Sequence, residues 1–183
     1  MRNLVYLILI MSIFLIVIGC SAKDVSSEAE FTLDSAYYGY VFGTFNHDYS
    51  TRLFEFGQIV KKASEIKNER DLDYLKGRID AFLMGRPGSF GEIVSIDKRY
   101  LDKIIIPELQ QPIFNLLNDL EFYISSLYKI VEEKDLQKLS QLREEFKELY
   151  QLERKINDNG YQNSQDKERF LATINKMEEI MKK

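Results

Sequence analysis

Apolar residues recur at alternating steps of three and four along most of the chain after residue 33. The clearest stripes run from Leu109 to Ile130, from Leu139 to Ile156 and from Phe170 to Met181. This spacing places the residues of each stripe on one face of an α-helix. Such faces need partner helices, and short connections favour antiparallel neighbours. The sequence therefore predicts an all-α protein, an up-and-down helical bundle of four to five helices.

Local signals set the expected helix boundaries. Asp135 and Ser164 can cap helices at their start, and Asn159-Gly160 can end one. Pro107 and Pro112 each remove a backbone donor, so we expect the third helix to be kinked or split into a short lead and a long body. The expected helices cover residues 33–67, 69–84, 97–134, 135–158 and 164–182.

The first 22 residues carry a different signal. Leu4 to Gly19 form an apolar run in which Ser12 is the one conventionally polar residue. A transmembrane helix needs about 20 apolar residues, so the run suits the core of a signal peptide better. Its end, Val17-Ile18-Gly19-Cys20, resembles the lipobox of bacterial lipoproteins.

That resemblance implies a diacylglyceryl lipid on the Cys20 thiol and cleavage between Gly19 and Cys20. The expected organisation is a signal peptide over residues 1–19, a lipidated flexible tether over 20–32 and one helical domain over 33–183. The protein would then be anchored to the cell membrane, on its extracytoplasmic face. The alternative is an uncleaved N-terminal anchor in which Cys20 is incidental. Since Cys20 is the single cysteine of the chain, no disulfide is expected.

The first expected helix, 33–67, carries three arcs of residues. A broad apolar arc is expected to form the core: Tyr38, Val41, Phe42, Phe45, Tyr49, Phe56, Ile59, Val60 and Ala63. Arg52 falls inside it, where it can pair with Asp48 or Glu55 on the same helix or extend along the edge of the bundle. A second arc holds residues of low helix propensity, which suggests a close approach of another helix: Gly39, Gly43, Asn46, Ser50 and Gly57.

A third arc aligns Tyr40, His47 and Phe54 at seven-residue spacing, with Tyr37 nearby. Three interpretations stay open for this helix. It can be central and buried all round, it can pack against a second copy or a protein partner, or it can line a small-molecule groove. Exposed tyrosine and other aromatic residues are enriched at protein interfaces, which favours the second interpretation.

Residues for enzyme chemistry are scarce. His47 is the single histidine and Cys20 is assigned to lipid, so no Cys-His pair is available. Asp48 points about 100° away from His47 on a helix, which argues against a catalytic triad. The chain has no histidine pair or Cys-x-x-Cys for a metal, and no glycine-rich phosphate loop. We expect no enzyme activity, no metal and no cofactor.

A formal net charge of −4 also argues against nucleic-acid binding. The expected function is a membrane-tethered, non-enzymatic domain that binds another protein or macromolecule of the cell envelope. Candidate contacts are Tyr37, Tyr40, His47 and Phe54, with Arg86 from the loop Gly85 to Ser95. The alternative is a receptor or sensor accessory that holds a small apolar ligand in a cavity near Pro107 and Pro112.

Overall fold

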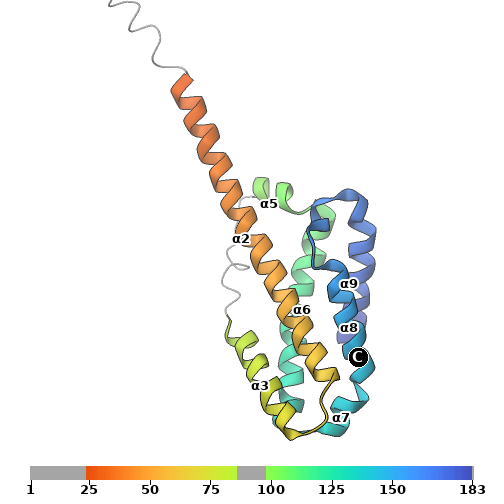
Figure 1. Cartoon of the computed structure of the whole chain (residues 1–183). Coiled ribbons are helices and arrows are strands. Elements are labelled where there is room, and N and C mark those ends of the chain that lie inside the picture. The colour runs from red at the N-terminus through yellow and green to blue at the C-terminus, as the bar shows by residue number, and fades with distance from the viewer. Residues whose placement is uncertain (1–23, 86–97, 183) are drawn as a thin grey trace, which may run out of the picture. The chain divides into compact units, whose positions relative to one another are not determined.

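The computed structural model describes residues 24–85 and 98–182, and these residues are all-α, without a β-strand (Figure 1). The expected fold class is therefore confirmed. The expected bundle of four to five helices is not confirmed, since the described residues form seven α-helices. They are α2 (Asp24–Ser64), α3 (Glu69–Met84), α5 (Lys98–Ile104), α6 (Pro107–Glu132), α7 (Leu136–Gln141), α8 (Arg143–Ile156) and α9 (Lys167–Met181).

The chain divides into two units, Met1–Val41 and Phe42–Lys183, which we describe separately. In the first unit, the described residues form the beginning of α2. The helix already starts at Asp24, so residues 24–32, expected to be a flexible tether, are helical. Glu28, Ala29 and Glu30 are good helix formers, which accounts for this difference. Cys20 and the lipobox lie outside the described residues. Within the described residues, no helix is long and apolar enough to cross a bilayer.

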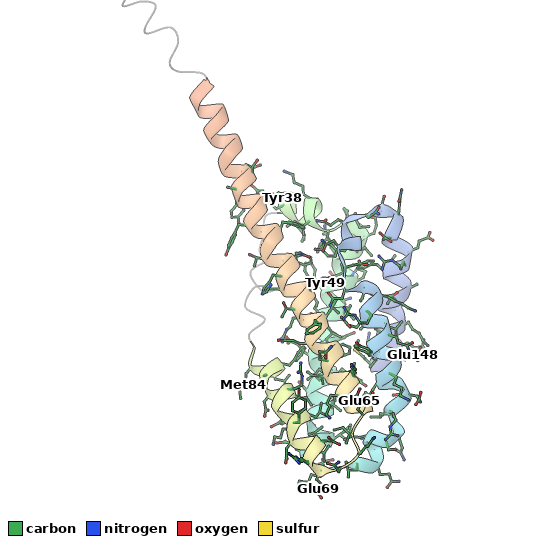
Figure 2. All side chains as sticks on the ribbon, in the orientation of Figure 1. Tyr38, Tyr49, Glu65, Glu69, Met84 and Glu148 are labelled. Carbon is green, nitrogen blue, oxygen red and sulfur yellow. The ribbon has the colours of Figure 1, made fainter. Side chains whose placement is uncertain are left out.

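The second unit has a continuous apolar core. Helix α6 packs against α3 and α9, and α9 packs against α8. The buried face of α6 follows the expected stripe through Leu109, Ile113, Leu116 and Leu120, all with no exposed surface. From Phe42 onward, helix α2 contributes its own core residues, including Tyr49, which is fully buried (labelled in Figure 2). The three-and-four spacing therefore identifies the core faces correctly.

Pro107 splits the expected third helix, as its missing backbone donor requires. Helix α5 ends at Ile104, and Pro107 occupies the first turn of α6, where no donor is needed. Pro112 has a different outcome, because it lies inside α6 without ending it. The split into a short lead and a long body is therefore confirmed at Pro107 alone.

The last two expected helices are also divided. Asp135 caps α7 by accepting a hydrogen bond from the Lys138 backbone N–H at 2.8 Å, as expected. Leu142 then interrupts the helix between α7 and α8. Ser164 does not cap α9. It begins a short 3-10 turn, η2 (Ser164–Asp166), which follows η1 (Asn159–Gln162) and is capped by Asn163.

Candidate functional site

The part of α2 in the second unit is held in one rotational orientation by its buried face. Phe45, Tyr49, Leu53, Phe56 and Val60 are all fully buried and follow helical spacing. Burial of each large apolar side chain contributes about 1.5–3 kcal/mol, so rotation of the helix about its axis would be strongly unfavourable. The opposite face of α2 is consequently fixed toward solvent.

Polar contacts attach α2 to the segment around α8 and η1. The Tyr49 hydroxyl donates to the Ile156 carbonyl at 2.6 Å, and the Tyr161 hydroxyl donates to Asn46 Oδ1 at 3.0 Å. The Asn157 side chain donates to the Ser50 carbonyl at 3.2 Å. Because these bonds connect residues more than 100 positions apart in the chain, they also set the register between α2 and α8.

Arg52 joins α2 to two other helices. Its guanidinium donates to the Phe82 carbonyl at the end of α3 and to Glu121 Oε1 on α6, both at 2.6 Å. It also lies 4.1 Å from the centroid of the Phe82 ring. The expected intrahelical pairing with Asp48 or Glu55 is therefore wrong, and so is a simple position along the bundle edge. Arg52 instead satisfies carbonyl and carboxylate groups across the helix junction.

The outer face of α2, defined here as His47 and Phe54, is solvent-exposed. Phe54 exposes 46% of its surface, and His47 is also exposed. In the first unit, Tyr37 and Tyr40 expose 47% and 70%. The interpretation that this helix is buried all round is therefore wrong. Arg86 lies outside the described residues.

The small residues of α2 have two different surroundings. At Gly57, an added Cβ would lie 2.5 Å from Glu153 Oε2, so this glycine admits a close contact with α8. At Gly39 and Gly43, an added Cβ would meet nothing within 4 Å. Close approach of another helix, expected for the whole arc, thus explains Gly57 but neither of the other two glycines.

Glu153 is the residue opposite Gly57, and it is completely buried. The Asn157 side chain donates to its Oε1 at 2.7 Å, whereas its Oε2 accepts no hydrogen bond. Arg154 Nε lies 3.5 Å from Oε2, but the Arg154 side chain is 45% exposed and its geometry forms no hydrogen bond. Burial therefore raises the pKa of Glu153, despite the opposing effects of Asn157 and Arg154.

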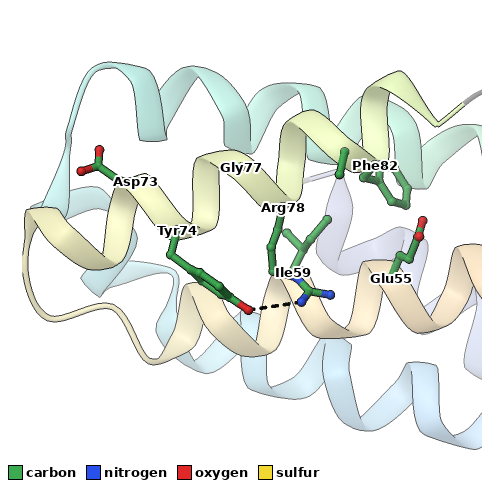
Figure 3. A pocket seen from close by; sticks show the side chains of 8 residues that line it. Glu55, Ile59, Asp73, Tyr74, Gly77, Arg78 and Phe82 are labelled. Carbon is green, nitrogen blue, oxygen red and sulfur yellow. Dashed lines mark hydrogen bonds between the residues drawn. The ribbon is translucent and has the colours of Figure 1, made fainter.

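A second candidate site is the α2–α3 groove, an open hollow of about 530 Å³ between these two helices (Figure 3). Its lining consists of Glu55, Ile59, Asp73, Tyr74, Gly77, Arg78, Ala81 and Phe82. Arg78 Nη1 donates to the Tyr74 hydroxyl at 3.3 Å, the dashed contact in Figure 3. The groove thus combines an apolar floor with side chains of both charges.

A further open hollow of about 660 Å³ lies where α2, α3 and α8 meet. Four basic side chains line it, together with Ser64, Glu65, Asn68 and Asp71: Lys62, Lys67, Arg143 and Lys147. The carboxylate of Asp71 already occupies a place in this hollow that an anionic ligand could take. It accepts hydrogen bonds from the Lys67 backbone N–H and from the Lys62 side chain. These bonds lower the pKa of Asp71. Since Lys62 pairs with Asp71 and Lys147 pairs with Glu144 at 2.7 Å, part of the positive charge of this hollow is used within the protein.

Comparison with known proteins supplies no family. No protein-family model, curated protein or solved structure matches the chain significantly. The site must therefore be argued from its own geometry. Within residues 24–85 and 98–182, no cluster of three or more histidine, cysteine or acidic residues is arranged to hold a metal ion.

The roles of Glu153 and Gly77 were not predicted from the sequence, although the sequence pattern around each residue is unusual. Glu153 lies four residues after Leu149 and three before Ile156, so it occupies a position of the apolar stripe. Gly77 lies in the middle of α3, where glycine is unfavourable. A charged residue within an apolar stripe and a glycine within a helix each indicate unusual surroundings. The close contact of Glu153 with Gly57 of α2, and the open groove beside Gly77, could not be read from α8 or α3 alone.

Proposed function

We propose that this chain is an exported lipoprotein, attached by a lipid on Cys20 to the extracytoplasmic face of the cell membrane. Its helical domain would be a non-enzymatic module that binds another protein or macromolecule of the envelope. The apolar run Leu4 to Gly19 and the lipobox-like end support the anchor. Two or three acyl chains hold a protein firmly to a bilayer without a spanning helix.

We further propose that the five longer helices, α2, α3, α6, α8 and α9, form an up-and-down bundle, with α5 and α7 as helical connections. The packing of α6 against α3 and α9, and of α9 against α8, supports this arrangement. A rigid bundle is well suited to binding, because a partner meets a surface that is already ordered.

The observation that carries the binding proposal is the exposure of Phe54 on a helix whose opposite face is fully buried. Exposed aromatic rings provide apolar contact area and lose little conformational entropy on binding, so they are frequent at interface hot spots. His47 lies about two turns before Phe54 on the same outer face and adds a polar group. Tyr37 and Tyr40 offer further exposed aromatic surface on the first unit.

Replacement of Phe54 or Tyr40 with serine tests this proposal. We expect each variant to retain less of the partner in affinity capture from the protein's own envelope, by about tenfold if the residue is a hot spot. Only a small loss of thermal stability is expected, since Tyr40 exposes 70% and Phe54 46% of its surface. Capture of a second copy would identify the partner as the protein itself.

Phe122 provides the matched control for this test. It lies on α6 and exposes 73% of its surface, so Phe122→Ser removes a comparable exposed ring from another helix. Capture should be unchanged in this variant. Equal losses at Phe54 and Phe122, or a lower melting temperature with unchanged capture at Phe54, would reject the outer face of α2 as the binding surface.

The two hollows described above do not support the alternative of a small apolar ligand near Pro107 and Pro112. Neither of the two hollows described above includes Pro107 or Pro112 in its lining, and both are open to solvent. The charged groups of the α2–α3 groove are also poorly suited to a purely apolar ligand.

A further inference from the structure

The floor of the α2–α3 groove is apolar and fixed. Ile59 of α2 and Phe82 of α3 each expose only 1% of their surface, so the packed core supports them from below. Ala81 and the ring of Tyr74 complete the apolar lining. A volume of about 530 Å³ is within the range of small-molecule sites, which is about 300–1,000 Å³.

Two opposite charges line this groove without pairing. Arg78 comes from α3 and Glu55 from α2, and no ion pair within 4 Å joins either of them to another described residue. Arg78 Nε is buried and has no hydrogen-bond partner. Because a buried donor without a partner is unfavourable, Arg78 has unused hydrogen-bonding capacity. The half-buried Glu55 carboxylate can also accept hydrogen bonds from a ligand.

Of the other charges near the groove, Arg52 and Lys62 are already paired, and Asp73 lies at the opposite end from Glu55 in Figure 3. Arg52 binds Glu121 and the Phe82 carbonyl, and Lys62 binds Asp71 at 3.3 Å. Asp73, at the end of the lining, is exposed and interacts electrostatically with Lys134. Arg78 and Glu55 are consequently the groups with which a ligand of small size would form its charged contacts.

Gly77 keeps the rim of the groove open. It is exposed in the middle of α3, and an added Cβ would meet nothing within 4 Å. Close helix packing therefore does not explain a residue that weakens a helix interior. Any larger side chain at this position would project into the open space at the groove.

We propose that the α2–α3 groove binds a free apolar α-amino acid. Its carboxylate would accept hydrogen bonds from the Arg78 guanidinium and the Tyr74 hydroxyl, and its ammonium group would donate to the Glu55 carboxylate. The apolar side chain would lie over Ile59 and Phe82. Charge-assisted hydrogen bonds of both signs would select a zwitterion over a singly charged compound. This site is separate from the outer face of α2.

Amide NMR titration of the full-length chain in detergent micelles tests the proposal. The three probes share a phenyl ring on a two-carbon chain and differ in the charged groups that they carry. L-phenylalanine carries both charges, 3-phenylpropanoate lacks the ammonium group, and 2-phenylethylamine lacks the carboxylate. We expect L-phenylalanine to shift the Gly77 and Ala81 signals saturably, with a dissociation constant of about 1 mM or below. Each of the other probes should bind at least about tenfold more weakly. No saturable shift with L-phenylalanine, or equal binding of all three probes, would overturn the proposal.

Substitutions assign the two charged contacts separately. Arg78→Gln should weaken L-phenylalanine and 3-phenylpropanoate but leave 2-phenylethylamine unchanged. Glu55→Gln should weaken L-phenylalanine and 2-phenylethylamine but leave 3-phenylpropanoate unchanged. Uniform effects of both substitutions on all three probes would contradict direct contact with the ligand charges.

Gly77→Leu distinguishes a filled groove from a damaged fold. Leucine is a better helix former than glycine, so the variant should melt at a higher temperature while it loses binding of L-phenylalanine. Gly43→Leu is the matched control, because Gly43 is also exposed within a helix and has open space around it, but lies outside the groove. Gly43→Leu should still bind L-phenylalanine.

Retained binding of L-phenylalanine in Gly77→Leu, or an equal loss of this binding in Gly43→Leu, would contradict the α2–α3 groove as the binding site. Unchanged binding in Phe54→Ser would separate this result from the partner-binding proposal.

Discussion

Glu153 shows how one residue can oppose the pattern that surrounds it. The apolar stripe of α8 places it among Leu149, Leu152 and Ile156, which are buried as expected. A carboxylate in such surroundings loses its hydration, and one hydrogen bond from Asn157 replaces only part of it. Burial therefore favours the neutral acid more in the folded protein than in the unfolded chain, in agreement with the raised pKa of Glu153.

This raised pKa predicts how stability depends on pH. Since the folded protein binds the proton more tightly than the unfolded chain, the contribution of Glu153 is fully present below the unfolded pKa, which is about 4.3. It is lost as the pH rises through the higher pKa of the folded state. Glu153→Gln should remove this loss, because the amide oxygen can still accept from Asn157 and the group stays neutral.

Thermal melts over a pH series provide the measurement. We expect Glu153→Gln to melt at a higher temperature than the unmodified chain at pH 7, with the difference shrinking toward pH 4. Glu144→Gln is the control on the same helix, since the side chain of Glu144 is 81% exposed. A destabilised Glu153→Gln variant at pH 7 would contradict the conclusion that burial of the Glu153 charge is unfavourable.

At the scale of the element, α2 makes opposite predictions for two of its glycines. Gly43→Ala should stabilise the protein by about 1 kcal/mol, because alanine favours the helix and its Cβ meets nothing within 4 Å. Gly57→Ala should destabilise it, because the new Cβ would lie 2.5 Å from Glu153 Oε2 and 2.8 Å from Cδ. Overpacking costs about 1–3 kcal/mol, more than the gain in helix propensity.

Chemical denaturation of both variants measures these differences. Each glycine serves as the control for the other, since both substitutions make the same chemical change within one helix. Similar free energies of unfolding for Gly43→Ala and Gly57→Ala would show that the contact between Gly57 and Glu153 does not constrain the packing of α2 against α8.

The ends of the helices show where local rules suffice. Pro107 begins α6 and Asp135 caps α7, and both outcomes follow from backbone donors near a helix start. Leu142 was not expected to interrupt a helix, because leucine favours helical structure. Both flanking helices pack through buried residues, Leu139 in α7 and Phe146 in α8, and local preference does not account for the break between them.

At the scale of the whole molecule, the lipid anchor is the first property to test. Cys20→Ala should abolish labelling by a radioactive or clickable fatty acid and leave precursor of higher mass, because the thiol is the proposed attachment point. Mass spectrometry of the unmodified protein should find Cys20 as the first residue, with its lipid. Normal processing of the Cys20→Ala chain would contradict the anchor.

The sequence by itself determined the properties that depend on neighbours along the chain. Helical spacing identified the all-α class and the buried faces, Pro107 the split before α6, and the lipobox-like motif the proposed anchor at Cys20. Tertiary structure decided the properties that depend on groups distant in sequence: the pairing of Arg52 with Glu121, the contact of Gly57 with Glu153, and the groove that Arg78 and Glu55 share. Periodicity specifies which face of a helix is buried, but the free energy of a buried charge depends on the groups that face it from another helix.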